Sequence, residues 1–207
     1  MTTVVEFVLG GSDVPWRAVG FAVNDSGTVQ LGGIRCRFDA NSLTLGITSW
    51  ALAEADDPSA TSIDGLATSH RDTIDSERVT ATHPNGVIGI DHVVVYTPDL
   101  ERTCAAITGA TAAPLKRIRE VGTLRQGFHR LGELIVEVVT FPDIALGGAL
   151  FWGLALNVSD IDAMFDSYGP EVLSPPRDAV QPGRRISSFR DSVLLGLPVA
   201  LMTSPQR

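Results

Sequence analysis

The sequence predicts an α+β protein built from tandem modules, each with one strand, one helix and three further strands. The first observation is an internal repeat, because residues 90–110 align with residues 151–171 when the sequence is shifted by 61 positions. The second is the pattern within each copy, where an alternating apolar run precedes turn residues and a segment with helical periodicity. Further short apolar runs follow both copies, so we expect two equivalent modules, residues 89–147 and 148–207.

The helix of each module has recognisable ends. Thr97 is the expected N-cap of the first helix, with Pro98 at the first helical position, where its missing N–H costs nothing. Ser159 is expected to open a capping box with Asp162, and Gly169 to end the second helix. The apolar residues of the second helix recur every three or four positions, which predicts one buried face. They are Ile161, Met164, Phe165 and Tyr168.

Three strands follow each helix in the predicted fold, separated by glycine, proline or charged turn residues. In the first module they are residues 115–119, 124–131 and 134–141, and in the second module residues 172–180, 184–190 and 197–203.

The residues ahead of the repeat are predicted to form a degenerate third module and a connector. Residues 1–54 read as a strand, a short helix, a hairpin and two strands. These features are residues 4–9, 15–19, a turn at 25–27, 34–38 and 47–53. Residues 55–88 are rich in Ser, Thr and Asp and poor in large apolar residues, so we expect a connector with little regular structure.

Composition narrows the classes of partner. Acidic residues outnumber basic ones by 24 to 16, and the formal net charge of -8 repels phosphate backbones and anionic lipid. We therefore expect neither a nucleic acid nor a membrane partner. The sequence does not decide whether the protein forms a homodimer. Cys36 and Cys104 lack the spacing of a zinc or redox site, which favours two buried, reduced thiols. Without a signal-peptide pattern or an apolar run of membrane-spanning length, a cytoplasmic location is expected.

Two polar residues lie within apolar strands of the first module. His92 is in the first strand (IDHVVV) and Glu137 is in the last (LIVEVVTF). This module, used in tandem, resembles the glyoxalase, or vicinal oxygen chelate, superfamily. The resemblance implies that residues 89–207 curl into a half-open barrel. It also implies that a His or Glu of the first strand and a Glu of the last strand of each module hold a divalent metal facing the cavity. The whole chain also resembles glyoxalase-like proteins that carry a shortened extra module in front.

The implied metal set is only half present. His92 and Glu137 match the ligand positions of the first module. The offset of 61 puts Gly153 opposite His92, and Ala200 is the best match to Glu137 in the last strand. Since catalytic metal sites normally use three protein ligands, a divalent ion stays possible but no cofactor is firmly expected.

Other side chains could complete the site. His129 is the best candidate, but alternation along its strand leaves open whether His129 or the set containing Gln126 faces the cavity. Weaker candidates are His83, Glu6 and Glu54.

An arginine of the second module could also face the cavity. Alternation sends Arg184 to one face and Arg185 to the other, and we take Arg185 as the candidate for binding an anionic group.

Three classes of function remain for the barrel. The first is binding of a small organic ligand without a complete metal site, through His92, Glu137, His129, Gln126 and Arg185. A carboxylate in a buried strand needs a polar partner, and its desolvation would suit Glu137 to act as a general base. The alternative is a metal-dependent lyase, isomerase or dioxygenase with His92 and Glu137 as metal ligands. A structural or interaction role with a filled barrel is the third class, because this architecture hosts many chemistries.

Overall fold

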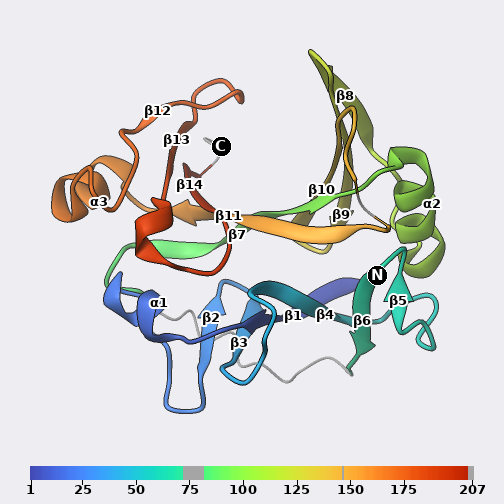
Figure 1. Cartoon of the computed structure of the whole chain (residues 1–207), viewed down its shortest axis with the longest axis horizontal. Helices are drawn as coiled ribbons and strands as arrows, with labels where there is room; N and C mark the ends of the chain where they lie inside the picture. Colours follow the sequence, from blue (N-terminus) through green and yellow to red (C-terminus); the bar gives the residue numbers. More distant parts are fainter. Residues whose placement is uncertain (72–81, 146, 205–207) are drawn as a thin grey trace.

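The structure is a computed structural model that describes residues 1–71, 82–145 and 147–204. Two curved sheets pack face to face (Figure 1). The six-stranded sheet has the order β2-β3-β1-β4-β6-β5, and the eight-stranded sheet has the order β12-β13-β14-β11-β7-β10-β9-β8. Both ends of the eight-stranded sheet rise away from the six-stranded sheet in Figure 1, so this sheet is curved but not closed. We call the face of each sheet that is turned away from the other sheet its open face.

The eight-stranded sheet contains the two predicted modules. Its elements are β7 (Val87–Tyr96), α2 (Leu100–Thr111), β8 (Arg117–Val121), β9 (Leu124–Leu131), β10 (Leu134–Thr140), β11 (Leu150–Val158), α3 (Ile161–Tyr168), β12 (Arg177–Asp178), β13 (Arg185–Ser188), the 3₁₀ helix η1 (Asp191–Val193) and β14 (Val199–Thr203). In each module the first strand pairs in parallel with the last, as β7 does with β10 and β11 with β14. The two first strands, β7 and β11, pair with each other in antiparallel fashion.

The strand register confirms the repeat offset. The pairing of β7 with β11 skips Asp91 on one strand and Trp152 on the other, so each strand carries a β-bulge. These two bulges are 61 residues apart, as are the two strands in the sequence repeat. The modules are therefore equivalent, as predicted.

The helix starts differ from the predictions by one or two residues. Asp99 caps α2 and Asp160 caps α3, and each carboxylate accepts hydrogen bonds from backbone N–H groups of the first turn. The predicted caps, Thr97 and Ser159, are wrong because a nearby carboxylate fits the positive helix N-terminus better than a hydroxyl does. Gly169 follows α3 with a φ of 75°, which confirms the predicted helix end.

The strand predicted at residues 172–180 is interrupted. Only an isolated bridge between Leu173 and Phe189 and the two-residue β12 form there. Pro175 and Pro176 lie between them and have no N–H to donate to a neighbouring strand, which explains the interruption.

The six-stranded sheet repeats the same architecture in shortened form. Its elements are β1 (Thr3–Gly10), α1 (Val14–Ala18), β2 (Thr28–Leu31), β3 (Ile34–Asp39), β4 (Gly46–Ala53), β5 (Ser62–Ile63) and β6 (Leu66–His70). β1 pairs in parallel with β3 and antiparallel with β4, as β7 does with β10 and β11. β4 in turn pairs in parallel with β6. Among the described residues, the first shortened module has one strand fewer than a full module, and the second has one strand fewer and no helix.

Two expectations for the N-terminal region are therefore wrong. Residues 55–88, expected to have little regular structure, contain β5 and β6, because buried Ile63 and Leu66 anchor this segment beside β4. Residues 72–81 lie outside the described residues. The hairpin turns at residues 32–33 instead of 25–27. The reason is that the side chain of Asn24 accepts hydrogen bonds from backbone N–H groups of residues 26 and 28, which closes a local turn ahead of β2.

The main core lies between the two sheets. Phe151 of β11 packs edge-on against Phe7 and Trp50 of the six-stranded sheet, with ring centroids 6.0 and 5.3 Å apart. Trp16 of α1 donates a hydrogen bond from Nε1 to the carbonyl oxygen of Leu195, 3.1 Å away. Cys36 and Cys104 are buried free thiols, as predicted. None of the helices within the described ranges is long and apolar enough to cross a membrane. With the apolar faces sequestered in this core, the open faces carry the polar chemistry.

Candidate ligand-binding site

The two predicted residues meet at the centre of the eight-stranded sheet. His92 of β7 pairs with Ile135 of β10, and Glu137 lies two residues further along β10, so both side chains emerge on the open face. Nε2 of His92 lies 3.4 Å from Oε2 of Glu137. Only 17% of the His92 side chain and 14% of the Glu137 side chain are exposed. The predicted proximity of these residues is confirmed.

Asp91 joins this pair because of the β-bulge. Strict alternation would direct Asp91 away from His92, but the bulge leaves Asp91 without a partner on β11 and turns both side chains together. Nδ1 of His92 lies 2.8 Å from Oδ2 of Asp91. Sequence reasoning missed Asp91, since no local pattern marks a bulge that the pairing of two distant strands creates.

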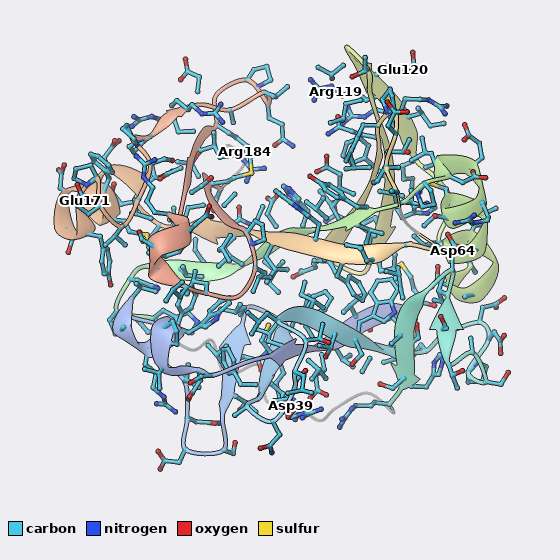
Figure 2. All side chains as sticks on the ribbon, viewed as in Figure 1. Asp39, Asp64, Arg119, Glu120, Glu171 and Arg184 are labelled. Carbon is cyan, nitrogen blue, oxygen red and sulfur yellow. The ribbon has the colours of Figure 1, made fainter. Side chains whose placement is uncertain are left out.

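Arg184 supports Asp91 from the second module. Its Nη2 donates to Oδ1 of Asp91 at 2.8 Å and to Oδ1 of Asn157 at 2.9 Å, and its Nε donates to the carbonyl oxygen of Thr203 at 2.7 Å. The side chain is 5% exposed. Figure 2 labels Arg184 on the open side of the sheet, across from Arg119 on the raised strand β8.

Arg185 does not join the site. Its guanidinium pairs with Asp162 of α3 and is 38% exposed. The structure therefore places Arg185 apart from His92 and Glu137, because β13 begins at Arg185 and directs that side chain to the helix-covered side. Arg184, one residue earlier, is the arginine that reaches the open face.

The protonation state of Asp91 determines the tautomer of His92. Burial by itself would raise the pKa of Asp91, but hydrogen bonds from His92 and Arg184, together with their charges, outweigh burial and lower this pKa to about 2. An ionised carboxylate only accepts hydrogen bonds, so Nδ1 of His92 carries a hydrogen. In the neutral imidazole Nε2 is then an acceptor that faces the carboxylate of Glu137. Only a shared proton or a cation makes that contact attractive.

Gln126 is the third side chain around Glu137. The register of β9 and β10 pairs Gln126 with Val139 and Phe128 with Glu137, which puts the Gln126 set on the open face. Nε2 of Gln126 donates to Oε1 of Glu137. Oε1 of Gln126 is buried and has no hydrogen-bond partner among the described residues.

His129 lies on the opposite side of β9, in the core. It is 1% exposed, and its Nδ1 lies 3.1 Å from the carbonyl oxygen of Ala113. Burial lowers the pKa of His129. His129 therefore does not complete the site as expected. The sequence left open which side chains of β9 face the site, and in the structure Gln126 does while His129 faces the core.

The weaker candidates also lie elsewhere. His83 bonds to backbone groups of residues 22 and 30 in the N-terminal region. Glu54 pairs with the terminal amino group at 2.9 Å. Glu6 lies in the six-stranded sheet, among arginines.

An aromatic platform adjoins Glu137. Tyr96 of β7 lies on the same side as His92 and stacks on Trp152 with a centroid distance of 4.9 Å and an interplanar angle of 16°. Burial, and then the charge of Glu137, raise the pKa of Tyr96. Trp152, the bulge residue of β11, is 40% exposed. The open face thus joins a polar centre to a flat apolar surface.

The residues present do not fit a conventional divalent metal site. In the second module, Gly153 and Ala200 correspond to His92 and Glu137, and neither has a ligating group. A Cβ atom at Gly153 would lie 2.6 Å from the carbonyl oxygen of Pro198, so the backbone closes this position to any side chain. Within the described ranges, no group of three or more His, Cys, Asp or Glu residues has the arrangement of a metal site. Two protein ligands are fewer than the three that catalytic sites normally use.

Comparison with known proteins yields matches in structure only. No protein-family model matches the sequence, and no curated protein matches it. The structure is similar to a mutant of 4-hydroxymandelate synthase from Streptomyces coelicolor, with 13% identity and a TM-score of 0.67 over 99% of this chain and 93% of that chain.

Smaller proteins also match part of the chain. Methylmalonyl-CoA epimerase from Mycobacterium tuberculosis is 20% identical, with a TM-score of 0.48 over 58% of this chain and 91% of that chain. The similarity to 4-hydroxymandelate synthase covers nearly the whole chain and so includes both sheets. The structural similarity therefore shows that the chain has a glyoxalase-like fold.

Proposed function

We propose that this protein binds a small organic ligand on the open face of the eight-stranded sheet, with Glu137 and His92 as its main polar contacts. The observation that carries the proposal is that Glu137 is largely buried without a positively charged arginine beside it. Its side chain is only 14% exposed, yet its polar contacts among the described residues are an amide and an imidazole instead of an arginine. Removing a carboxylate from water costs several kcal/mol unless hydrogen bonds or charges compensate. A donor group on a ligand would supply the missing compensation.

Neighbouring groups narrow the class of ligand. Oε1 of Gln126, which has no hydrogen-bond partner among the described residues, is a second acceptor beside Glu137, so an N–H or O–H group of the ligand would meet two acceptors. The stacked rings of Tyr96 and Trp152 suit a flat apolar part. We therefore expect a small molecule that has a hydrogen-bond donor next to an aromatic or conjugated group.

The same geometry supports proton transfer as a second candidate function. Arg184 orients Asp91, and Asp91 orients His92, so Nε2 of His92 faces Oε2 of Glu137 at 3.4 Å. The carboxylate of Glu137 would act as a general base by taking a proton from a bound molecule, and Nε2 of His92, an acceptor in this tautomer, would then share that proton with Oε2. This chemistry uses only residues of the chain, and no step requires a metal.

Ligand-observed NMR tests the binding proposal. A library of hydroxylated and amino-substituted aromatic fragments is screened by saturation transfer against the wild type, Glu137→Gln and the control Glu133→Gln, whose side chain is in an exposed turn. Fragments should bind the wild type and the control, and Glu137→Gln should weaken them at least about tenfold, as expected for a lost hydrogen bond to a charged group. If no fragment depends on Glu137, the proposal is wrong.

Fluorescence locates the binding. Trp16 and Trp50 are buried, with 1% and 0% exposure, so Trp152 is the tryptophan accessible to quenching by acrylamide. A fragment bound at the site should protect Trp152 from this quenching.

Elemental analysis of protein purified without chelator tests the metal-dependent alternative. A stoichiometric divalent ion that is lost in Glu137→Gln would replace the metal-free proposal.

A further inference from the structure

The open face of the six-stranded sheet carries a second polar cluster, in the same register as the first. The pairing of β1 with β4 skips Val5 and then joins Glu6 to Ala51. In the other sheet, the pairing skips Asp91 and then joins His92 to Ala155. Glu6 therefore occupies the position of His92.

The last strands correspond as well. Arg35 of β3 pairs with Glu6 as Ile135 pairs with His92, so Arg37 occupies the position of Glu137. The shortened N-terminal modules thus place arginine where the eight-stranded sheet places its carboxylate.

Three arginines surround Glu6, which is 1% exposed. The carboxylate lies 2.5 Å from Nη2 of Arg35, 2.9 Å from Nη2 of Arg71 and 3.8 Å from Nε of Arg37. Arg35 and Arg37 alternate along β3, and Arg71 follows β6. These side chains meet because β1 lies between β3 and β4, and β6 lies beside β4.

The cluster carries more positive charge than Glu6 neutralises. Among the ion pairs of the described ranges, Glu6 is the single carboxylate within 4.0 Å of these three guanidinium groups. Asp39, two residues beyond Arg37, accepts a hydrogen bond from the backbone N–H of residue 41 instead. Since arginine stays protonated at any ordinary pH, the described residues of the cluster have an excess of two positive charges on a chain whose net charge is -8.

The free donors belong to Arg37 and Arg71. Arg35 contacts Glu6 through two nitrogens, because its Nε also donates to Oε2 at 2.6 Å, and its side chain is less exposed than those of the other two arginines. Arg71 contacts Glu6 through one nitrogen, and Arg37 contacts it at the limit of an ion pair. Both of these side chains are 42% exposed, so their remaining N–H groups can reach a solute. Glu6 anchors the arginines while leaving donors available.

We propose that Arg37 and Arg71, held around Glu6, form a binding site for a phosphoryl group. A phosphate or phosphate monoester is a dianion whose charge matches the local excess. Its oxygens accept the paired N–H groups of guanidinium in bidentate fashion. This site is on the opposite side of the molecule from Glu137 and is independent of the ligand proposed there.

Calorimetric titration with inorganic phosphate at low ionic strength tests the proposal, because salt screens an exposed site. The proteins are the wild type, Arg37→Gln, Arg71→Gln and the control Arg119→Gln. The control removes the same charge from β8 in the other sheet. Saturable binding should weaken at least about tenfold in the first two variants and less than about twofold in the control.

A second probe separates the sources of the phosphoryl group. If phenyl phosphate binds more tightly than inorganic phosphate, the site serves a phosphate ester; the reverse order assigns it to free phosphate. In both cases the Nε–H resonance of Arg37 should shift in the wild type on titration. The proposal is overturned if phosphate does not saturate, or if Arg119→Gln weakens binding as much as Arg37→Gln does.

Discussion

The two open faces have the same backbone frame and opposite chemistry. In each sheet a bulge on the first strand precedes the central polar residue, His92 in one and Glu6 in the other. In the eight-stranded sheet this residue faces a carboxylate, and in the six-stranded sheet it faces arginine side chains. The frame therefore specifies which positions converge, and the side chains specify what those positions can bind.

The two buried carboxylates also differ in how they are compensated. Glu6 has positive charge on three sides, so it is a structural anchor. Glu137 has an amide and an imidazole, so it keeps capacity for a further donor. The predictions below test this contrast, beginning with the largest expected effect.

Substitution of Glu6 should destabilise the fold most. Glu6→Gln leaves three arginines together without their central negative charge, and breaking a buried ion pair costs about 3 kcal/mol. Urea denaturation measures the change in the free energy of unfolding. The matched control is Glu101→Gln, because Glu101 is 63% exposed and pairs with Arg125 at the surface. The control should cost less than about 1 kcal/mol, and equal losses would refute the anchoring role of Glu6.

Asp91 should make the stability of the eight-stranded sheet depend on acid pH. Its folded-state pKa of about 2 lies below the ordinary value of 3.8, so its contribution is present above about pH 4 and is lost as the pH falls towards 2. The shift corresponds to about 2.5 kcal/mol. Unfolding curves of the wild type and Asp91→Asn, measured between pH 6 and 2.5, should converge towards the acid end. Parallel curves would contradict the role of Asp91 in holding His92 and Arg184.

A side chain at Gly153 should be poorly tolerated. The corresponding position of the six-stranded sheet is Ser49, which accepts a side chain, whereas a Cβ at Gly153 meets the backbone of Pro198. Gly153→Ala should therefore cost about 2 kcal/mol through overpacking. The control Gly109→Ala, on an open surface of α2, should be neutral or stabilising by up to about 1 kcal/mol. If Gly153→Ala is tolerated, the backbone of Pro198 does not exclude a metal-ligating side chain from this position.

The smallest expected effect concerns the buried His129, whose hydrogen bonding differs from that of the buried His83. Both ring nitrogens of His83 have backbone partners, whereas Nε2 of His129 has none among the described residues. Burial lowers the pKa of His129 below the ordinary 6.5, so the stability it contributes is present above about pH 6.5 and is lost as the pH falls. His129→Leu should reduce the fall in melting temperature between pH 7 and 5. An unchanged fall would assign the acid sensitivity to other groups.

The sequence by itself determined the modular architecture of residues 89–207 and the pair at the centre of the candidate site. A repeat of 61 residues predicts equivalent strands, and a histidine and a glutamate in apolar strands stand out against their neighbours. The absence of ligating side chains at Gly153 and Ala200 was also visible from that offset. These features are local patterns or direct comparisons of one segment with another.

Only the tertiary structure decided which other side chains reach the two open faces. The bulge that brings Asp91 beside His92 arises from the pairing of β7 with β11, whose sequences are remote from each other. The choices of Gln126 over His129 and of Arg184 over Arg185 depended on which face of a strand lies against the core. A shift of one residue in strand register reverses every side chain, and long-range packing sets that register. For the same reason, the arginines around Glu6 became a cluster only when β1, β3 and β6 were placed in one sheet.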